Sequence, residues 1–309
     1  KIKKIRTAAD LNIRNISEGR IEKLRERFEN AKDKYENAKE GLKDAKERLK
    51  EAREKGNQTG TFEHAKKYLL NSADALINHL EKIKTKVQEN ENIPDDKEAE
   101  IVAEIDAEIA EINSIKVEIE AANTREQIKE LAKKLQDKWK RLKHLIRFHT
   151  YRIVAARVMG IVNQGLVLEK RLDKILANLN ESGIDADVDE EVADFKEKIA
   201  TSRDKYKQAQ DKLTEIIDLR ASGEPADSEQ IKTLLDEANE LLKQARDALK
   251  EAHDLLKEIV KKIKEAAPDA DLSTETEVEV EQETSADTED TETETEIETN
   301  TTTEVNATT

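Results

Sequence analysis

A chain of 309 residues is long enough for two domains, and this one is 40% charged, 36% hydrophobic and only 3% aromatic. Eight glycines and three prolines allow few turns. This excludes most sheet-based enzyme folds, which need many turns and many β-branched or aromatic strand residues. The composition therefore predicts an all-α protein, with about six long helices in elongated antiparallel bundles.

The acidic residues are unevenly distributed along the chain. The net charge is −16, and the segment from Asp269 to the C-terminus holds fifteen acidic residues and no lysine or arginine. The preceding part then has 55 acidic residues against 54 basic ones, so it is close to neutral. General nucleic-acid binding needs a net basic surface that releases counterions, so we expect no nucleic-acid partner.

Cysteine is absent, which excludes disulfides, thiolate metal sites and cysteine nucleophiles. The longest apolar stretch, 153–168, is interrupted by Arg157, Asn163 and Gln164, so we expect no membrane span within this chain. The first residue is Lys1 and not Met. We therefore expect that an upstream segment has been removed, and a signal peptide or anchor is one candidate for it.

The N-terminal region combines a basic segment with a heptad pattern. Residues 1–16 are basic and weakly amphipathic, and they are predicted to form a short docking segment. Ser17 is expected to cap a helix that ends near Lys55. The core positions of this helix recur every seven residues and alternate with alanines, which let a neighbouring helix approach closely. They are Phe28, Tyr35, Leu42 and Leu49, with Ala31, Ala38, Ala45 and Ala52.

Two further helices are predicted before residue 125. Thr61 is expected to cap the second helix, and Pro94 lies close to the start of the third. Thr124 and Gln127 have the spacing of a capping box for the helix that follows. The third helix carries an apolar stripe on one face, formed by Ile101, Ile105, Ile112, Ile115 and Ile119.

The segment 125–179 is predicted to be one unbroken helix that two bundles share. One apolar seam occupies 135–160 and a second occupies 154–179, rotated from the first by about 100°. Where the seams overlap, the helix becomes apolar on nearly all sides. We therefore predict an N-terminal four-helix bundle over 17–158 and a C-terminal three-helix, spectrin-like unit over 159–267.

Two more helices, about 189–219 and 228–267, are predicted to complete the C-terminal unit. In the last of them, Leu242, Leu249 and Leu256 have heptad spacing. From 268 to 309 the chain becomes a Thr/Glu alternation with no apolar face to bury. Such a segment cannot offset its ordering entropy, so this acidic tail is predicted to be disordered.

The sequence offers no catalytic, cofactor or metal site. His144 and His149 lie about 140° apart on one helix and are poorly placed to share an ion. The chain has neither HExxH nor the Glu-x-x-His spacing of di-iron bundles. His149 is interpreted as a core residue, and His64, His79 and His253 as flanking or surface residues. The protein is therefore predicted to be no enzyme and to need no cofactor.

A basic stretch with interleaved aromatic residues gives a weak signal for polyanion binding. The alternative is that these cations pair with glutamates of the preceding helices, and it is favoured because Trp139 belongs to a core seam. The candidate patch consists of Lys138, Lys140, Arg141, Lys143, Arg147 and Arg152.

Five Asn-x-Ser/Thr triplets are candidate N-glycosylation sites, and all five are expected in loops or tails, where a glycan would not disturb packing. The alternative is that Asn, Ser and Thr collect in turns for conformational reasons. The five residues are Asn15, Asn57, Asn180, Asn300 and Asn306.

The segments RIEKLRERFENAKDKYENAKEGL (from residue 20) and HLIRFHTYRIVAARVMG (144–160) resemble a group of uncharacterised, secreted helical-bundle, or coiled-coil, proteins of archaea. The similarity covers roughly 18–180. The resemblance implies an extracytoplasmic setting, with a signal peptide before the bundle and a polar tail or membrane anchor after it. It implies no activity for any residue.

The leading hypothesis is a non-enzymatic extracytoplasmic or cell-surface protein with a structural or interaction role. A helical rod would be presented to a protein or cell-envelope partner on a flexible, acidic and glycosylated spacer. The alternative is an intracellular coiled-coil scaffold or chaperone-like binding module, whose acidic tail engages basic partners. A third hypothesis, a ligand- or metal-binding bundle, rests only on the basic stretch and His149.

Overall fold

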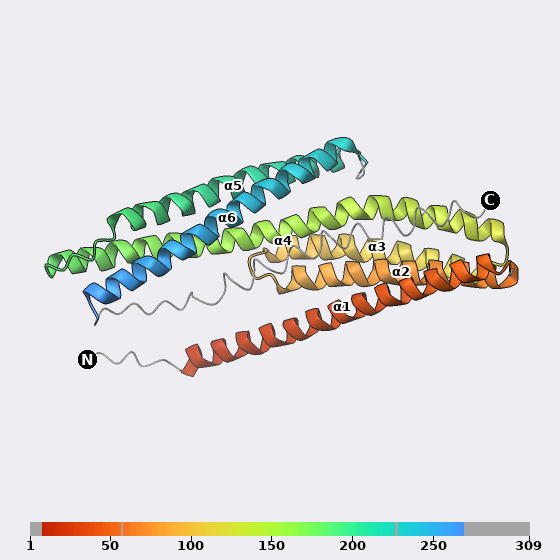
Figure 1. Ribbon diagram of the computed structural model, residues 1–309, viewed down its shortest axis with the longest axis horizontal. Coiled ribbons are helices and arrows are strands. Elements are labelled where there is room, and N and C mark those ends of the chain that lie inside the picture. Colours follow the sequence, from red (N-terminus) through yellow and green to blue (C-terminus); the bar gives the residue numbers. More distant parts are fainter. Residues whose placement is uncertain (1–7, 57, 226–227, 269–309) are drawn as a thin grey trace. The chain divides into compact units, whose positions relative to one another are not determined.

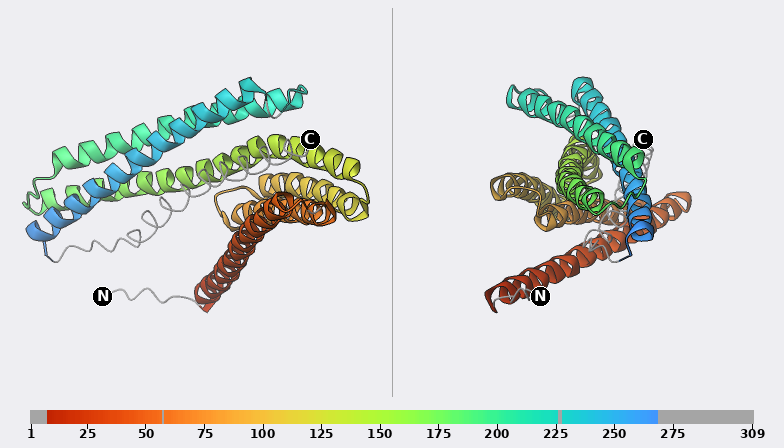
Figure 2. Two further views of the ribbon diagram at one scale, coloured as in Figure 1. Left: turned by 45° about the vertical axis from the view of Figure 1, so that its right-hand side comes forward. Right: turned by 90° about the vertical axis from the view of Figure 1, so that its left-hand side faces the viewer.

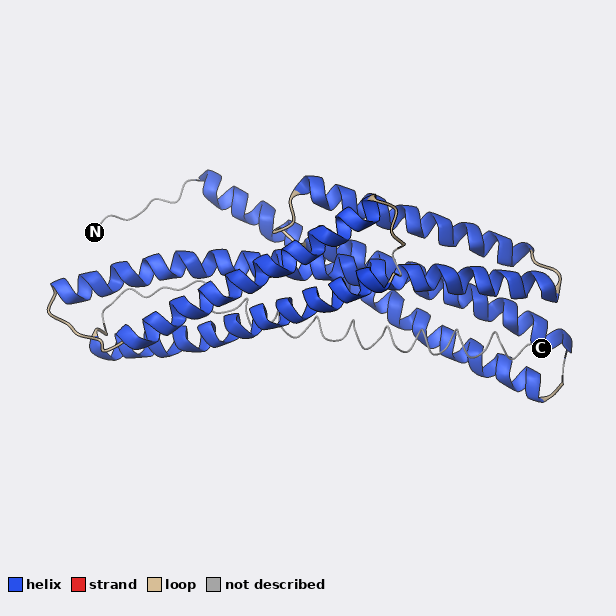
Figure 3. Ribbon diagram, turned by 90° about the horizontal axis from the view of Figure 1, so that it is seen from above, coloured by secondary structure: helices blue, strands red, loops and turns tan. Residues whose placement is uncertain are grey.

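The computed structural model describes residues 8–56, 58–225 and 228–268, and every secondary-structure element in them is an α-helix (Figure 1; Figure 3). The predicted all-α fold is confirmed. The helices are α1 (Ala8–Glu54), α2 (Gln58–Glu89), α3 (Asp95–Ala121), α4 (Arg125–Glu181), α5 (Asp189–Ala221) and α6 (Glu229–Ala266). The acidic tail, predicted to be disordered, begins at 269 and lies outside the described residues.

The helices form two compact units whose boundary lies inside α4. The first unit ends at Lys140 and the second begins at Arg141. The sequence placed this boundary at 158, further along the same helix. The prediction of one unbroken helix from Arg125 is confirmed, because α4 has 57 residues and therefore a length of about 85 Å.

Two predicted helix starts are wrong. The first helix was expected to begin at Ser17, but α1 begins at Ala8 and continues through Ser17. Residues 8–16 of the predicted docking segment therefore belong to α1, while residues 1–7 lie outside the described part. The second helix was expected to be capped by Thr61, but α2 begins at Gln58. Serine and threonine favour caps, yet inside a helix they cost only about 0.5 kcal/mol, so neighbouring residues can carry the helix past them.

In the first unit, α1 and α2 run antiparallel and pack closely together. The register is fixed by pairs such as Gly41 with Asn71, whose side-chain amide donates a hydrogen bond of 2.7 Å to the Gly41 carbonyl. The predicted heptad is buried at Tyr35, Leu42 and Leu49 and half-buried at Phe28. Small residues between these layers allow the short distance between the two helices.

α3 packs against α2 and leads into α4 through a short turn. The predicted isoleucine stripe of α3 is buried along its whole length. The predicted capping box is also confirmed. The backbone N–H of Gln127 donates to Thr124 Oγ1 at 3.2 Å, and the side-chain Oε1 of Gln127 accepts from the backbone N–H of Thr124 at 3.2 Å. This reciprocal pair satisfies amide groups that the first turn of α4 would otherwise leave without partners.

The second unit consists of the later part of α4 with α5 and α6, of which α5 and α6 run side by side (Figure 2). The predicted heptad of α6 is buried at Leu242 and Leu249 and half-buried at Leu256. The predicted start of this helix near residue 228 is confirmed, and the structure shows Ser228 as its cap, with its hydroxyl accepting from the Ile231 N–H at 3.3 Å. α5 lies so close to α4 that a Cβ atom on Gly165 would be 2.6 Å from Ile199 Cδ1.

We predict that Gly165→Ala lowers the stability of the second unit by about 1 kcal/mol. The added methyl group overpacks the contact with Ile199, while the better helix propensity of alanine offsets part of that cost. Thermal unfolding followed by circular dichroism measures the change. Gly41→Ala is the matched control, because its nearest neighbour is at an ordinary 3.6 Å and the change should be neutral or stabilising.

The partner variant Ile199→Val tests the cause, because valine lacks the Cδ1 atom that the new methyl group would meet. The loss of stability in the double variant should be about 1 kcal/mol smaller than the sum of the losses in the two single variants. Strict additivity would show that the packing of Gly165 on Ile199 is not the reason.

Candidate functional site

Among the residues that the structure describes, no group of three or more His, Cys, Asp or Glu side chains is placed to hold a metal ion. The candidate residues whose side chains the structure describes lie in two places. One is the basic stretch of α4, and the other is the junction between α4 and α5, where Asn180 lies.

Lys138 is held inside the first unit. Its side chain is only 6% exposed, and its ammonium group pairs with Glu108 and Glu111 of α3, the latter at 2.5 Å. This ammonium group therefore binds Glu108 and Glu111 and is not accessible to an external polyanion. The side chain of Lys140, by contrast, is 54% exposed, and its Nζ lies 3.8 Å from Oδ1 of Asp137 in the same helix.

Arg147 is held inside the second unit. Its guanidinium pairs with Asp236 of α6 at 2.5 Å and donates to the Tyr151 hydroxyl at 3.2 Å. Desolvation opposes its charged form, but the interactions with Tyr151 and Asp236 outweigh that effect and raise the pKa of Arg147 above its ordinary value. Its charge is therefore used to hold α6 on α4.

Arg152 takes part in a contact that the sequence did not indicate. The buried ring of Phe148 has two guanidinium groups over it, from Arg152 and from Arg220 in the last turn of α5, each 5.4 Å from the ring centroid. Cation–π contacts of this kind stabilise by about 0.5–2 kcal/mol. Because Arg220 is distant in sequence, no local pattern could have predicted the pair.

The basic stretch is therefore used largely within the protein. Lys138, Arg147 and Arg152 each make a specific contact inside their own unit, while Arg141 is exposed and Lys143 is half-buried. This distribution supports the interpretation as intramolecular pairing over the interpretation as a polyanion patch.

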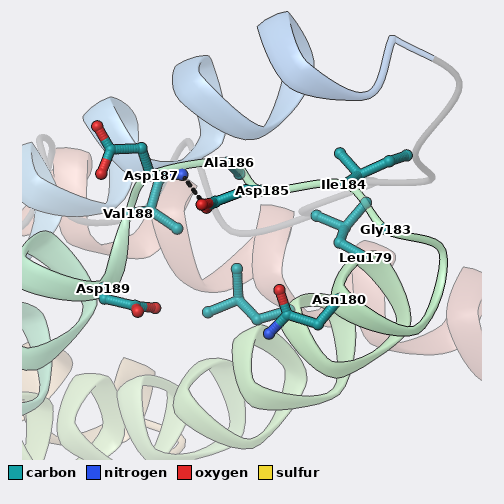
Figure 4. A pocket seen from close by; sticks show the side chains of 10 residues that line it. Leu179, Asn180, Gly183, Ile184, Asp185, Ala186, Asp187, Val188 and Asp189 are labelled. Atoms are coloured by element: carbon teal, nitrogen blue, oxygen red, sulfur yellow. Dashed lines mark hydrogen bonds between the residues drawn. The ribbon is translucent and has the colours of Figure 1, made fainter.

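The α4–α5 junction lines an open cavity of about 250 Å³ (Figure 4). α4 ends there because Gly183 adopts a left-handed φ of 73°, which lets the Ile184 N–H donate to the Leu179 carbonyl at 2.9 Å. Asp187 also has a positive φ of 48°, and its N–H donates to Asp185 Oδ1 at 2.9 Å. Asparagine and aspartate tolerate this conformation better than other residues.

Lys262 of α6 holds this junction in place. Its ammonium donates to the Asp187 carbonyl at 3.0 Å and pairs with Glu191 at 2.5 Å. The hydrogen bond from Lys262 keeps the pKa of Glu191 below its ordinary value. The junction is therefore anchored from both α5 and α6.

Asn180 is the one candidate glycosylation residue whose side chain the structure describes. It is exposed in the final turn of α4 and lines the cavity, and the Ser182 hydroxyl of its triplet donates to the Asn178 carbonyl at 2.9 Å. The expectation that all five triplets lie in loops or tails is wrong for Asn15, which is within α1, and for Asn180, which is in the last turn of α4. Asn57, Asn300 and Asn306 lie outside the described residues.

The histidines follow the predictions in part. His149 is buried, as expected for a core residue, but His79 is also buried, so its interpretation as a flanking or surface residue is wrong. The reason is that the ring of Tyr35 from α1 stacks on His79 at 4.8 Å. His64 and His253 are half-buried.

In the parts of the chain that the structure describes, no helix is long and apolar enough to cross a membrane. Comparisons with protein-family models, with curated proteins and with solved structures found no match.

We predict that Lys138→Met destabilises the first unit by about 2 kcal/mol, because Glu108 keeps a largely buried carboxylate without its cation. The single tryptophan, Trp139, is buried in the first unit, so its fluorescence during urea unfolding measures the change. Lys140→Met is the control and should change stability by less than about 0.5 kcal/mol. Equal effects of the two variants would contradict the assignment.

We also predict that Lys262→Met loosens the α4–α5 junction in a pH-dependent way. The pKa of Glu191 is lowered in the folded protein, so the stabilisation from its pair with Lys262 is present at neutral pH and fades as the pH falls through that pKa. Amide exchange of residues 183–188 should therefore be faster in the variant at pH 7, and the difference should shrink in acid. Lys261→Met, at an exposed neighbouring position, should leave exchange unchanged.

Proposed function

We propose that this chain is a non-enzymatic structural or interaction protein that works outside the cytoplasm. A helical body would be presented to a protein or cell-envelope partner on an extended acidic spacer. The observation that carries the proposal is α4, a single helix of 57 residues that contributes to both compact units. A continuous helix is a stiff spacer, whereas enzymes more often place their reactive groups on loops held by a scaffold.

The packing of the described helices is consistent with a mechanical role. Side chains on successive helices pair across their surfaces, as in Lys84 with Asp106 at 2.6 Å and Lys196 with Asp173 at 2.6 Å. Each exposed ion pair contributes little to the stability alone, but such pairs determine which faces of two helices contact each other. The result is a body of long helices joined by short connections.

The spacer part of the proposal rests on composition. The segment 269–309 has fifteen carboxylates and no basic residue. Repulsion between like charges favours extended conformations, and Thr-rich acidic segments are suited to carry a domain away from a surface. The same charge favours the second candidate function, an intracellular scaffold or chaperone-like module that engages basic partners with this segment.

Cell fractionation of the native source, followed by intact-mass analysis, distinguishes the two. The first proposal expects the chain in the envelope or extracellular fraction, with a mass above that of the polypeptide. A bare polypeptide mass in the cytosolic fraction would contradict it and favour the scaffold.

We predict that Asn180 contributes part of this added mass. Its side chain is exposed at a helix end, so an oligosaccharide there would not displace the core. In the native host, Asn180→Gln and Ser182→Ala should each remove the modification from the peptide that contains residue 180. Asn163→Gln is the matched control, because Asn163 is also exposed on α4 but is followed by Gln164 and Gly165 and forms no triplet. An unmodified wild-type peptide would exclude this site while leaving the fractionation result to decide the setting.

A further inference from the structure

A buried histidine and two lysines gather around one tyrosine at the α1–α2 interface. We call this group the Tyr35 cluster; it consists of Tyr35 and Lys39 of α1 and His79 and Lys82 of α2. Tyr35 and His79 are each 1% exposed, and their rings stack with centroids 4.8 Å apart. The ammonium groups of Lys82 and Lys39 lie 5.3 Å and 5.7 Å from the centroid of the same tyrosine ring.

The surroundings of the cluster add further charges. On α1, Glu36 lies 3.6 Å from Lys39, but its side chain is 53% exposed and therefore well solvated. On α2, Lys86 is buried one turn beyond Lys82 and lies over the ring of Phe28. Two ion pairs between α2 and α3, Lys84 with Asp106 and Asp74 with Lys116, lie on positions of α2 that point away from the side bearing His79.

This arrangement disfavours a positive charge on His79. Burial removes the hydration that an imidazolium needs, and the ammonium groups of Lys39 and Lys82 repel it. The face of the Tyr35 ring attracts cations, which acts in the opposite direction. That ring already has two ammonium groups over it, and for a side chain this deeply buried desolvation is the larger effect.

We propose that His79 is a pH-sensitive lock of the α1–α2 pair: neutral imidazole packs on Tyr35 and keeps the two helices together, and protonation in mild acid loosens them. The unfolded chain exposes His79 to water, where histidine titrates near pH 6.5. Below that pH the unfolded state binds a proton that the closed cluster resists. The contribution of His79 to the stability of the first unit is therefore fully present above about pH 7, and it is lost as the pH drops.

Urea unfolding of the full chain, followed by Trp139 fluorescence between pH 7.5 and pH 5, tests the proposal. In the wild type, the unfolding equilibrium constant should rise by up to about tenfold for each pH unit below 6.5 through this one group. His79→Phe keeps an aromatic ring against Tyr35 but cannot be protonated, so its unfolding constant should depend less steeply on pH. His253→Gln, in the second unit, is the control and should keep the wild-type slope.

An unchanged pH slope in His79→Phe would overturn the proposal. If that variant does not fold, His79→Gln provides the same comparison with a smaller neutral side chain. Hydrogen exchange of the wild-type protein needs no variant. After correction for intrinsic rates, amides of α1 and α2 around the cluster should lose at least tenfold protection between pH 7.5 and pH 5, and equal protection at the two pH values would also exclude the lock.

Discussion

The continuity of α4 is the constraint on which the rest of the structure depends. One helix supplies apolar side chains to two successive cores. The apolar stripe that contains the buried Trp139 in the first unit is therefore replaced, further along α4, by the stripe that contains the buried Leu172 in the second. Because a helix turns by about 100° per residue, an offset of one residue in the apolar pattern is enough for this change of face. A proline or an extended loop inside α4 would remove the element that both units share.

Close approach of helices is the second recurring device. Gly165 faces Ile199, so in the second unit a residue without a side chain lets α5 come near α4. In the first unit, the Gly41 carbonyl accepts a hydrogen bond from Asn71 of the neighbouring helix. Polar contacts then fix the register, as Lys138 does on α3 and Lys262 does at the α4–α5 junction. Apolar burial supplies most of the stability, while these sparse contacts select one arrangement among several helical alternatives.

The sequence predicted the features that depend on local spacing. The Thr124–Gln127 capping box, the start of α6 near residue 228 and the isoleucine stripe of α3 all follow from residues within a few turns of one another, and all are confirmed. What it missed depends on partners far along the chain. The burial of His79 requires Tyr35, the contact of Phe148 requires Arg220, and the anchoring of the α4–α5 junction requires Lys262. Hydrophobic periodicity cannot identify which polar residue a distant helix will cover.

The close helix pairs described above, α1 with α2, α2 with α3 and α5 with α6, all join consecutive elements, and this has a kinetic consequence. Contacts between neighbours in sequence give a low contact order, and the loop-closure entropy paid for each pair is small. Small helical domains with such local contacts fold in microseconds to milliseconds, much faster than β-sandwiches of similar stability. Each hairpin can form as soon as its second helix has left the ribosome, so little apolar surface waits for a partner that has not yet been synthesised.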